Sequence, residues 1–112
     1  MEMKLNALAI ALTAIVLGAL PAQADTAPAR CDYYKKGEDK VEVSMSCTFS
    51  QRQGFVSIQW HDGVRNEFTP VGDQPGEYTD RRGGRVYREL DALGNAGQVF
   101  RMENGSIFVY WQ

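Results

Sequence analysis

Apolar and polar residues alternate with a period of two over several short stretches of this chain. Alternation of this kind is the pattern of a strand that buries one face. Glycine or proline interrupts each stretch before a long helix could form. The sequence therefore predicts antiparallel strands joined by tight turns. The clearest alternation sets Val41, Val43, Met45 and Cys47 against Glu42, Ser44, Ser46 and Thr48.

Seven or eight short strands of this kind are expected in succession along the chain. A flat sheet of that many strands would leave its edges open to aggregation, and closure into a barrel removes them. We therefore expect an all-β fold, a small antiparallel barrel-like meander of seven to eight strands, with a β-sandwich as the alternative. The expected strands are residues 31–35, 41–48, 55–60, 64–69, 77–80, 85–90, 98–103 and 106–111.

Two dipeptides between strands, Asp62-Gly63 and Asn104-Gly105, are typical of two-residue hairpin turns. At Asn104-Gly105 such a turn gives both strands one shared apolar face. At Asp62-Gly63 it would set Trp60 beside Arg65, so either that loop is longer or the hairpin exposes part of both faces. The shared face of the last hairpin would carry Phe100, Met102, Ile107, Val109 and Trp111.

Cys31 and Cys47 are the two cysteines of the chain. If the first hairpin turns near Glu38 and Asp39, Cys31 lies across from Cys47, which suits disulfide geometry. In an oxidising compartment this pair is expected to close and to stabilise the fold by about 3 kcal/mol. With a single histidine, His61, the cysteines fall short of a structural zinc site.

Residues 1–24 have the features of a secretory signal peptide: a short polar start, an apolar run and the small-x-small end Ala22-Gln23-Ala24. We expect cleavage before Asp25, a loose N-terminal tail over residues 25–30, and one all-β domain over residues 31–112. The expected location is periplasmic or secreted, and no membrane span is expected after cleavage.

The formal net charge of the chain is −2. Glu2 and Lys4 cancel within the leader, so this balance belongs to the mature part. It gives no overall attraction to nucleic acid or anionic lipid. The sequence does not indicate the oligomeric state.

No catalytic motif stands out. His61 precedes a turn, where a solvated residue is the more usual occupant, and there is no Gly-x-Ser-x-Gly elbow. The carboxylates are scattered without a favoured pair. We expect a protein that is not an enzyme and needs no cofactor.

The strongest local feature is a run of four arginines around Gly83-Gly84. Guanidinium groups suit carboxylate, phosphate or sulfate partners, and neighbouring tyrosines could stack or donate hydrogen bonds. The alternative is a solvated strand face with cross-strand ion pairs, since acidic residues lie alongside. The candidate ligand-binding residues are Tyr78, Arg81, Arg82, Arg85, Tyr87 and Arg88.

Between Cys47 and Trp111, the segments CTFSQRQGFVSIQW, GEYTDRRGGRVYR and VFRMENGSIFVYW resemble a group of small exported bacterial proteins of unassigned activity. A remoter resemblance is to bacterial inhibitors of c-type lysozyme, which are exported antiparallel β-barrels with a disulfide. Residues 84–87 match the last four positions of that family's Ser-Gly-x-x-Tyr segment. Gly83 replaces its serine, and Ala96, before Gly97, replaces the lysine of its Lys-Gly segment.

Together these features favour a non-enzymatic exported domain that binds a protein or an anionic envelope ligand through the hairpin at residues 81–88. Lysozyme inhibition is one specific form of this hypothesis. The competing classes are a small envelope enzyme without a recognisable motif and an accessory structural subunit that pairs through exposed aromatic side chains.

Overall fold

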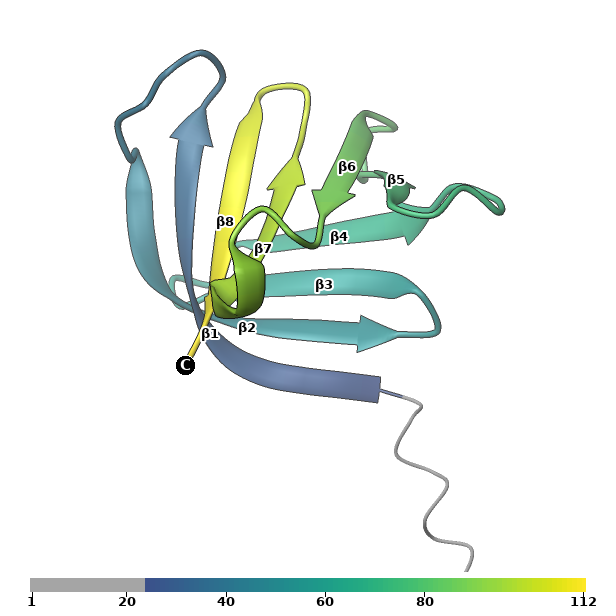
Figure 1. Ribbon diagram of the computed structural model, residues 1–112, viewed down its shortest axis with the longest axis horizontal. Helices are drawn as coiled ribbons and strands as arrows, with labels where there is room; N and C mark the ends of the chain where they lie inside the picture. Colours follow the sequence, from purple (N-terminus) through teal and green to yellow (C-terminus); the bar gives the residue numbers. More distant parts are fainter. Residues whose placement is uncertain (1–23) are drawn as a thin grey trace, which may run out of the picture.

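The computed structural model describes residues 24–112, and the expected signal peptide lies almost entirely outside that range. Over the described range each strand pairs antiparallel with the next, and β8 pairs with β1, so the sheet closes into a barrel (Figure 1). The expected meander barrel is confirmed. Its strands are β1 (Ala24–Lys35), β2 (Val43–Arg52), β3 (Phe55–Trp60), β4 (Arg65–Pro70), β5 (Glu77–Thr79), β6 (Arg85–Glu89), β7 (Gly97–Arg101) and β8 (Gly105–Trp111).

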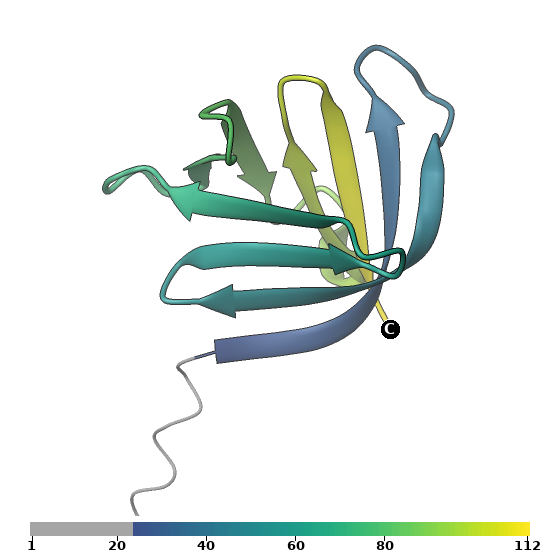
Figure 2. The ribbon, with the colours of Figure 1, turned by 180° about the vertical axis from the view of Figure 1, so that it is seen from behind.

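The barrel is strongly twisted. Seen from the front and from behind, β2, β3 and β4 run across the direction of β7 and β8 (Figures 1 and 2). A single 3₁₀ turn, η2 (Gly94–Ala96), lies between β6 and β7 within the described residues. None of the helices in residues 24–112 has the length and apolar character to cross a membrane.

Strand β1 is much longer than expected. Residues 25–30, which we expected to form a loose tail, pair with β2 from Asp25↔Gln51 to Arg30↔Ser46. Their sequence gives no clear strand pattern, because Ala27 and Ala29 are small and Pro28 is a poor strand residue. β8 pairs with β1 only from Ala29 onward, so Pro28 lies where β1 has one neighbour and its missing N–H is tolerated.

The disulfide between Cys31 and Cys47 is present, with the two Cα atoms 5.8 Å apart. The expected register is wrong, however. Cys31 lies opposite Met45 and Cys47 opposite Ala29, so the bonded cysteines are diagonal neighbours. The register differs by two residues, and a shift of two keeps every side chain on the same face.

The Asp62-Gly63 hairpin uses the longer of the two loops that the sequence allowed. The amide of Trp60 donates to the carbonyl of Val64, which leaves three residues in the loop, and Gly63 has a φ of 95°. A three-residue loop with glycine in the left-handed region is a common hairpin connection. As a result Ile58 lies opposite Asn66, whereas a two-residue loop would have set it opposite Glu67.

The last hairpin turns one residue earlier than expected. Arg101 pairs with Ser106, and the amide of Met102 donates to the carbonyl of Gly105, so Asn104-Gly105 is not the central pair. Gly105 serves a different purpose: a Cβ there would collide with the carbonyl oxygen of Tyr34 on β1. The apolar face predicted for this hairpin nevertheless points into the barrel.

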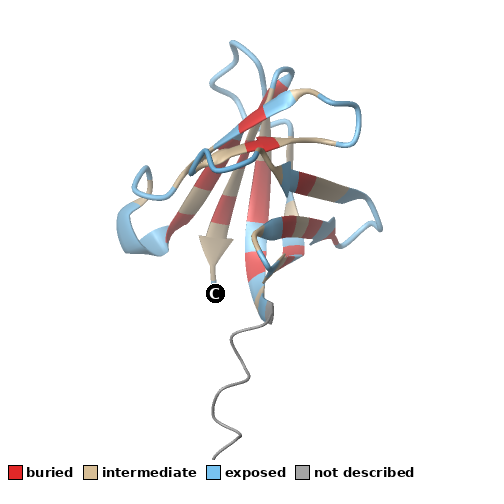
Figure 3. Cartoon of the chain, turned by 90° about the vertical axis from the view of Figure 1, so that its right-hand side faces the viewer, coloured by how far each residue is buried: buried red, intermediate tan, exposed pale blue. Residues whose placement is uncertain are grey.

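The interior is filled by inward side chains from all eight strands, and buried and exposed positions alternate along them (Figure 3). The Phe100 ring lies between two others, 5.3 Å from Phe68 and 6.3 Å from Phe49. Each large buried side chain stabilises the fold by about 1.5–3 kcal/mol. The core residues are Ala29, Cys31, Cys47, Phe49, Val56, Ile58, Trp60, Phe68, Tyr78, Val86, Phe100, Ile107 and Val109.

Neighbouring strands of a meander run in opposite directions, so alternate connections leave the barrel at the same end. The β1–β2, β3–β4, β5–β6 and β7–β8 connections share one end, which we call the mouth. The β2–β3, β4–β5 and β6–β7 connections share the opposite end. This topology decides where each candidate residue lies.

Candidate functional site

The structure divides the arginine-rich hairpin among three places. Alternation along β6 points Arg88 into the barrel and Arg85 and Tyr87 outward. Arg81 and Arg82 belong to the β5–β6 turn at the mouth. The six candidate residues therefore do not form one cluster.

Arg88 links several strands at the end of the barrel opposite the mouth. Its guanidinium donates to Oε1 of Gln98 at 2.9 Å, to the hydroxyl of Tyr78 at 3.0 Å and to Oε1 of Gln51 at 2.8 Å. These bonds join β6 to β7, β5 and β2. The guanidinium also lies 5.4 Å from the centre of the Phe100 ring, within the range of a cation–π interaction. Tyr78 and Arg88 are thus bonded to each other inside the barrel.

Arg85 and Tyr87 lie on the outer wall. Arg85 forms an exposed ion pair with Glu77, with 3.5 Å between nitrogen and oxygen. Its backbone amide donates to Glu103 at 3.3 Å. Tyr87 is exposed. This part of the hairpin has the cross-strand ion pairing that the alternative interpretation describes.

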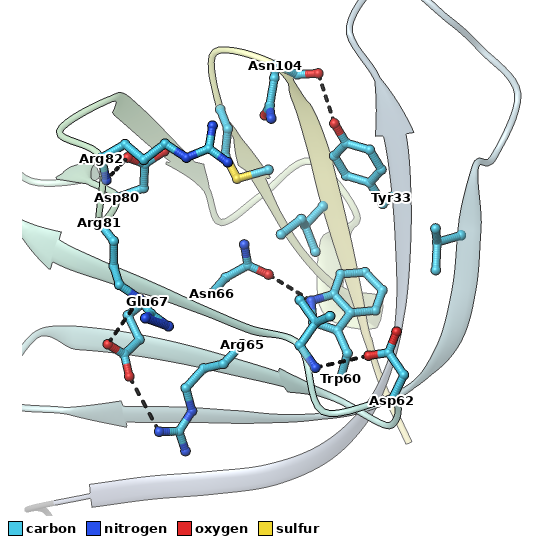
Figure 4. Close-up of a pocket in the computed structure, with 14 residues that line it drawn as sticks. Tyr33, Trp60, Asp62, Arg65, Asn66, Glu67, Asp80, Arg81, Arg82 and Asn104 are labelled. Carbon is cyan, nitrogen blue, oxygen red and sulfur yellow. Dashed lines mark hydrogen bonds and ion pairs between the residues drawn. The ribbon is translucent and has the colours of Figure 1, made fainter.

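The mouth contains a pocket of about 510 Å³ to which all four hairpins of that end contribute (Figure 4). The Trp60 side chain is 6% exposed, and Ile107 is buried beneath the opening. Val64 stands at the edge with 55% exposure. The apolar and aromatic lining consists of Tyr33, Val43, Trp60, Val64, Met102 and Ile107.

The polar atoms of the two aromatic lining residues are already bonded. The indole N–H of Trp60 donates to Oδ1 of Asn66 at 2.7 Å, and the hydroxyl of Tyr33 donates to the backbone carbonyl of Asn104 at 2.9 Å (Figure 4). What these rings offer to a ligand is therefore mainly their carbon surface. A ligand with an apolar body suits this lining.

Three acidic and three basic side chains also line the mouth. Most of the acidic groups already have partners. Glu67 lies 3.4 Å from Arg65 and 3.7 Å from Arg81. Oδ1 of Asp80 accepts the amide of Arg82 at 2.9 Å, which holds the β5–β6 turn. The charged lining residues are Asp62, Arg65, Glu67, Asp80, Arg81 and Arg82.

The guanidinium of Arg82 differs from its neighbours. Among the ion pairs of residues 24–112, none involves Arg82. Its side chain extends from the β5–β6 turn toward the β7–β8 hairpin, across the opening (Figure 4). Of the three arginines at this opening, Arg82 is the one whose guanidinium has no carboxylate partner in the described part of the chain.

The sequence did not single out Trp60, Asn66 or Met102 as site residues. The signal that could have found them is the topology, because a meander brings every second turn to one end. Trp60 and Asn66 flank the third turn, and Met102 precedes the seventh. His61 lies exposed in the β3–β4 loop. Within residues 24–112, no three His, Cys, Asp or Glu side chains lie close enough to hold a metal ion.

A second group of aromatic side chains lies on the outer wall of β1 and β8. The Phe108 ring is 5.0 Å from Tyr34 and 6.4 Å from Tyr110, and the Arg30 guanidinium lies 4.6 Å above Tyr110. Burial raises the pKa of Tyr110, and Tyr34 and Asp32 add to that effect while Arg30 opposes it.

A small pocket of about 270 Å³ lies at the end opposite the mouth, beside Arg88 and Trp111. The mouth is therefore the larger of these two concave sites. It also combines an apolar lining with an unpaired cation. No protein-family model, curated protein or solved structure matches this chain.

Proposed function

We propose that this protein is a non-enzymatic, exported binding domain and that it recognises a protein or an anionic component of the cell envelope at the mouth of its barrel. The observation that carries the proposal is the Arg82 guanidinium beside an open, partly apolar pocket of about 510 Å³. The mouth of a small β-barrel is a common place for a binding site. Export rests on the signal-peptide features of residues 1–24 and agrees with the disulfide.

The chemistry of the mouth suits recognition. Arginine presents a planar fork of donors to an anion, while the half-buried Val43 and Met102 supply apolar surface. The lining mixes these with ion pairs such as Glu67–Arg81, an exposed contact of 3.7 Å between β4 and the β5–β6 turn. A pre-formed site loses little entropy when it binds.

Inhibition of c-type lysozyme is a specific form of this proposal, suggested by the sequence resemblance. The two segments that carry the resemblance do not lie together here. Gly83 belongs to the β5–β6 turn at the mouth, and Ala96 lies in η2 in the β6–β7 connection at the opposite end. A lysozyme complex would therefore use the mouth without the second segment. The activity of a c-type lysozyme, measured with and without added protein of residues 25–112, tests for inhibition. Undiminished lysozyme activity excludes this form of the proposal.

Site-specific photo-crosslinking in the exporting cell tests the general proposal. A photoreactive phenylalanine analogue at Val64 lies at the exposed edge of the mouth, and the same analogue at Thr48 lies on the exposed outer wall of β2. We expect a crosslinked adduct from position 64, absent from position 48 and lost in Arg82→Ser. Equal adducts from both positions, or none, would contradict recognition at the mouth.

A further inference from the structure

We infer that the mouth binds a singly charged carboxylate attached to an apolar body. The inference rests on the proposed function and specifies the ligand class for the same pocket. Two features of the lining carry it: the charge balance of the mouth and the position of its apolar surface relative to Arg82.

The charge balance limits the ligand to one negative charge. Three arginines and three carboxylates line the pocket, so their formal charges cancel. A dianion such as a phosphate monoester would gain from Arg82 but would also face Asp62, Asp80 and Glu67. A carboxylate matches the two parallel donors of one guanidinium and adds a single charge. The free guanidinium is therefore matched best by a monoanion.

The apolar surface requires more than a small ion. The pocket volume of about 510 Å³ falls within the range of sites for small organic ligands. Trp60 and Tyr33 have their polar atoms bonded within the protein and leave mainly carbon surface for the ligand. Burial of an alkyl group against such surface contributes about 0.8 kcal/mol per methylene. The anion at Arg82 and the chain over the half-buried Tyr33, Val43 and Met102 then bind together.

This chemistry has two sources, a free alkyl carboxylate and the C-terminus of a peptide that ends in an apolar residue. Octanoate serves as the probe for the first and N-acetyl-glycyl-leucine for the second. Octanol and the amide of the dipeptide are the matched probes without the negative charge. In a Trp111→Phe background, Trp60 is the single tryptophan of residues 25–112, so its fluorescence reports on the mouth.

We expect octanoate, the dipeptide acid or both to change the Trp60 emission with a Kd below about 1 mM, and the uncharged partner of each to bind at least tenfold more weakly. Arg82→Ser should weaken binding at least tenfold, and Arg85→Ser, which removes an outer-wall arginine, should leave it unchanged. Binding of octanoate alone identifies a free carboxylate, and binding of the dipeptide alone identifies a chain end.

Failure of all four probes to bind, equal binding of acid and uncharged probe, or equal binding to the Arg82→Ser variant would overturn the inference. The proposed function fails separately, through the absence of a crosslink at position 64. A crosslink at that position without carboxylate binding would keep the mouth as the recognition site and discard the ligand class.

Discussion

Replacement of Arg88 by methionine is the perturbation whose outcome the structure specifies in most detail. The methionine keeps an unbranched apolar stem but removes the guanidinium. Three hydrogen bonds are lost, to Gln98, Tyr78 and Gln51, and the hydroxyl of Tyr78, a residue only 7% exposed, loses its partner. The cation–π contact with Phe100 is lost as well.

The magnitude follows from these contacts. A hydrogen bond to a charged group contributes about 1.5–3 kcal/mol, and a cation–π contact about 0.5–1 kcal/mol. These contributions do not add, because all of the contacts share one half-buried guanidinium. We expect a net loss of about 2–3 kcal/mol, which lowers Tm by about 10–20 °C in a domain of this size.

Thermal unfolding of residues 25–112, followed by circular dichroism, measures the effect. Arg85→Met is the matched control, because its exposed ion pair with Glu77 contributes at most about 1 kcal/mol. Arg88→Lys keeps the charge but loses the planar fork and should recover less than half of the loss. An Arg88→Met variant that melts at or above the wild-type temperature would refute the view that Arg88 holds this end of the barrel together.

Three further predictions concern the rest of the barrel. Gly97→Ala should lower the free energy of unfolding by about 2–4 kcal/mol, because a Cβ there collides with the carbonyl oxygen of Val109; an unchanged urea midpoint would contradict this. Replacing Cys31 and Cys47 together by alanine should lower the free energy of unfolding by about 3 kcal/mol, since the disulfide closes a loop with a sequence separation of 16. Urea unfolding of that double variant measures the loss of stability, and a midpoint equal to that of the wild type would contradict a stabilising role of the disulfide. Because the pKa of Tyr110 is raised in the folded state, stability should hold below about pH 10 and fall as the pH rises through that pKa. Thermal melts at alkaline pH should show a smaller fall in Tyr110→Phe, and an equal fall would assign the effect to other groups.

The sequence predicts which face of each strand is buried better than it predicts which residues are opposite one another. The alternation in β2 and β8 placed Cys47, Ile107 and Val109 in the core correctly. The registers of the first and last hairpins each differ by two residues from the expected ones. A period of two cannot distinguish registers that differ by two, because both put the same side chains inside.

The register predicted for the last hairpin is wrong for a physical reason that involves its glycine. Asn104-Gly105 has the composition of a two-residue turn, yet Gly105 is needed because β1 passes too close for a side chain. Contacts of this kind arise only when distant strands meet at the closure of the barrel. The N-terminal half of β1 was missed because Ala27 and Pro28 give no alternating signal.

The arginine run predicted a candidate site only in part. The four arginines are close in the sequence but lie in three places. Arg81 and Arg82 lie at the mouth, Arg85 on the outer wall and Arg88 in the barrel interior. The rest of the mouth comes from the other three hairpins, such as the one that carries Trp60. Only the closed topology brings these residues together.

The two tryptophans of the domain lie at opposite ends of the barrel, Trp60 at the mouth and Trp111 beside Arg88. Their indole N–H signals can be followed separately in ¹H–¹⁵N correlation spectra of residues 25–112 during a titration with octanoate and with N-acetyl-glycyl-leucine. We predict that at least one of these probes shifts the Trp60 indole and the amides of the β5–β6 turn while the Trp111 indole stays in place. Shifts centred on Trp111, or no shift with either probe, would contradict the assignment of the mouth as a carboxylate-binding site.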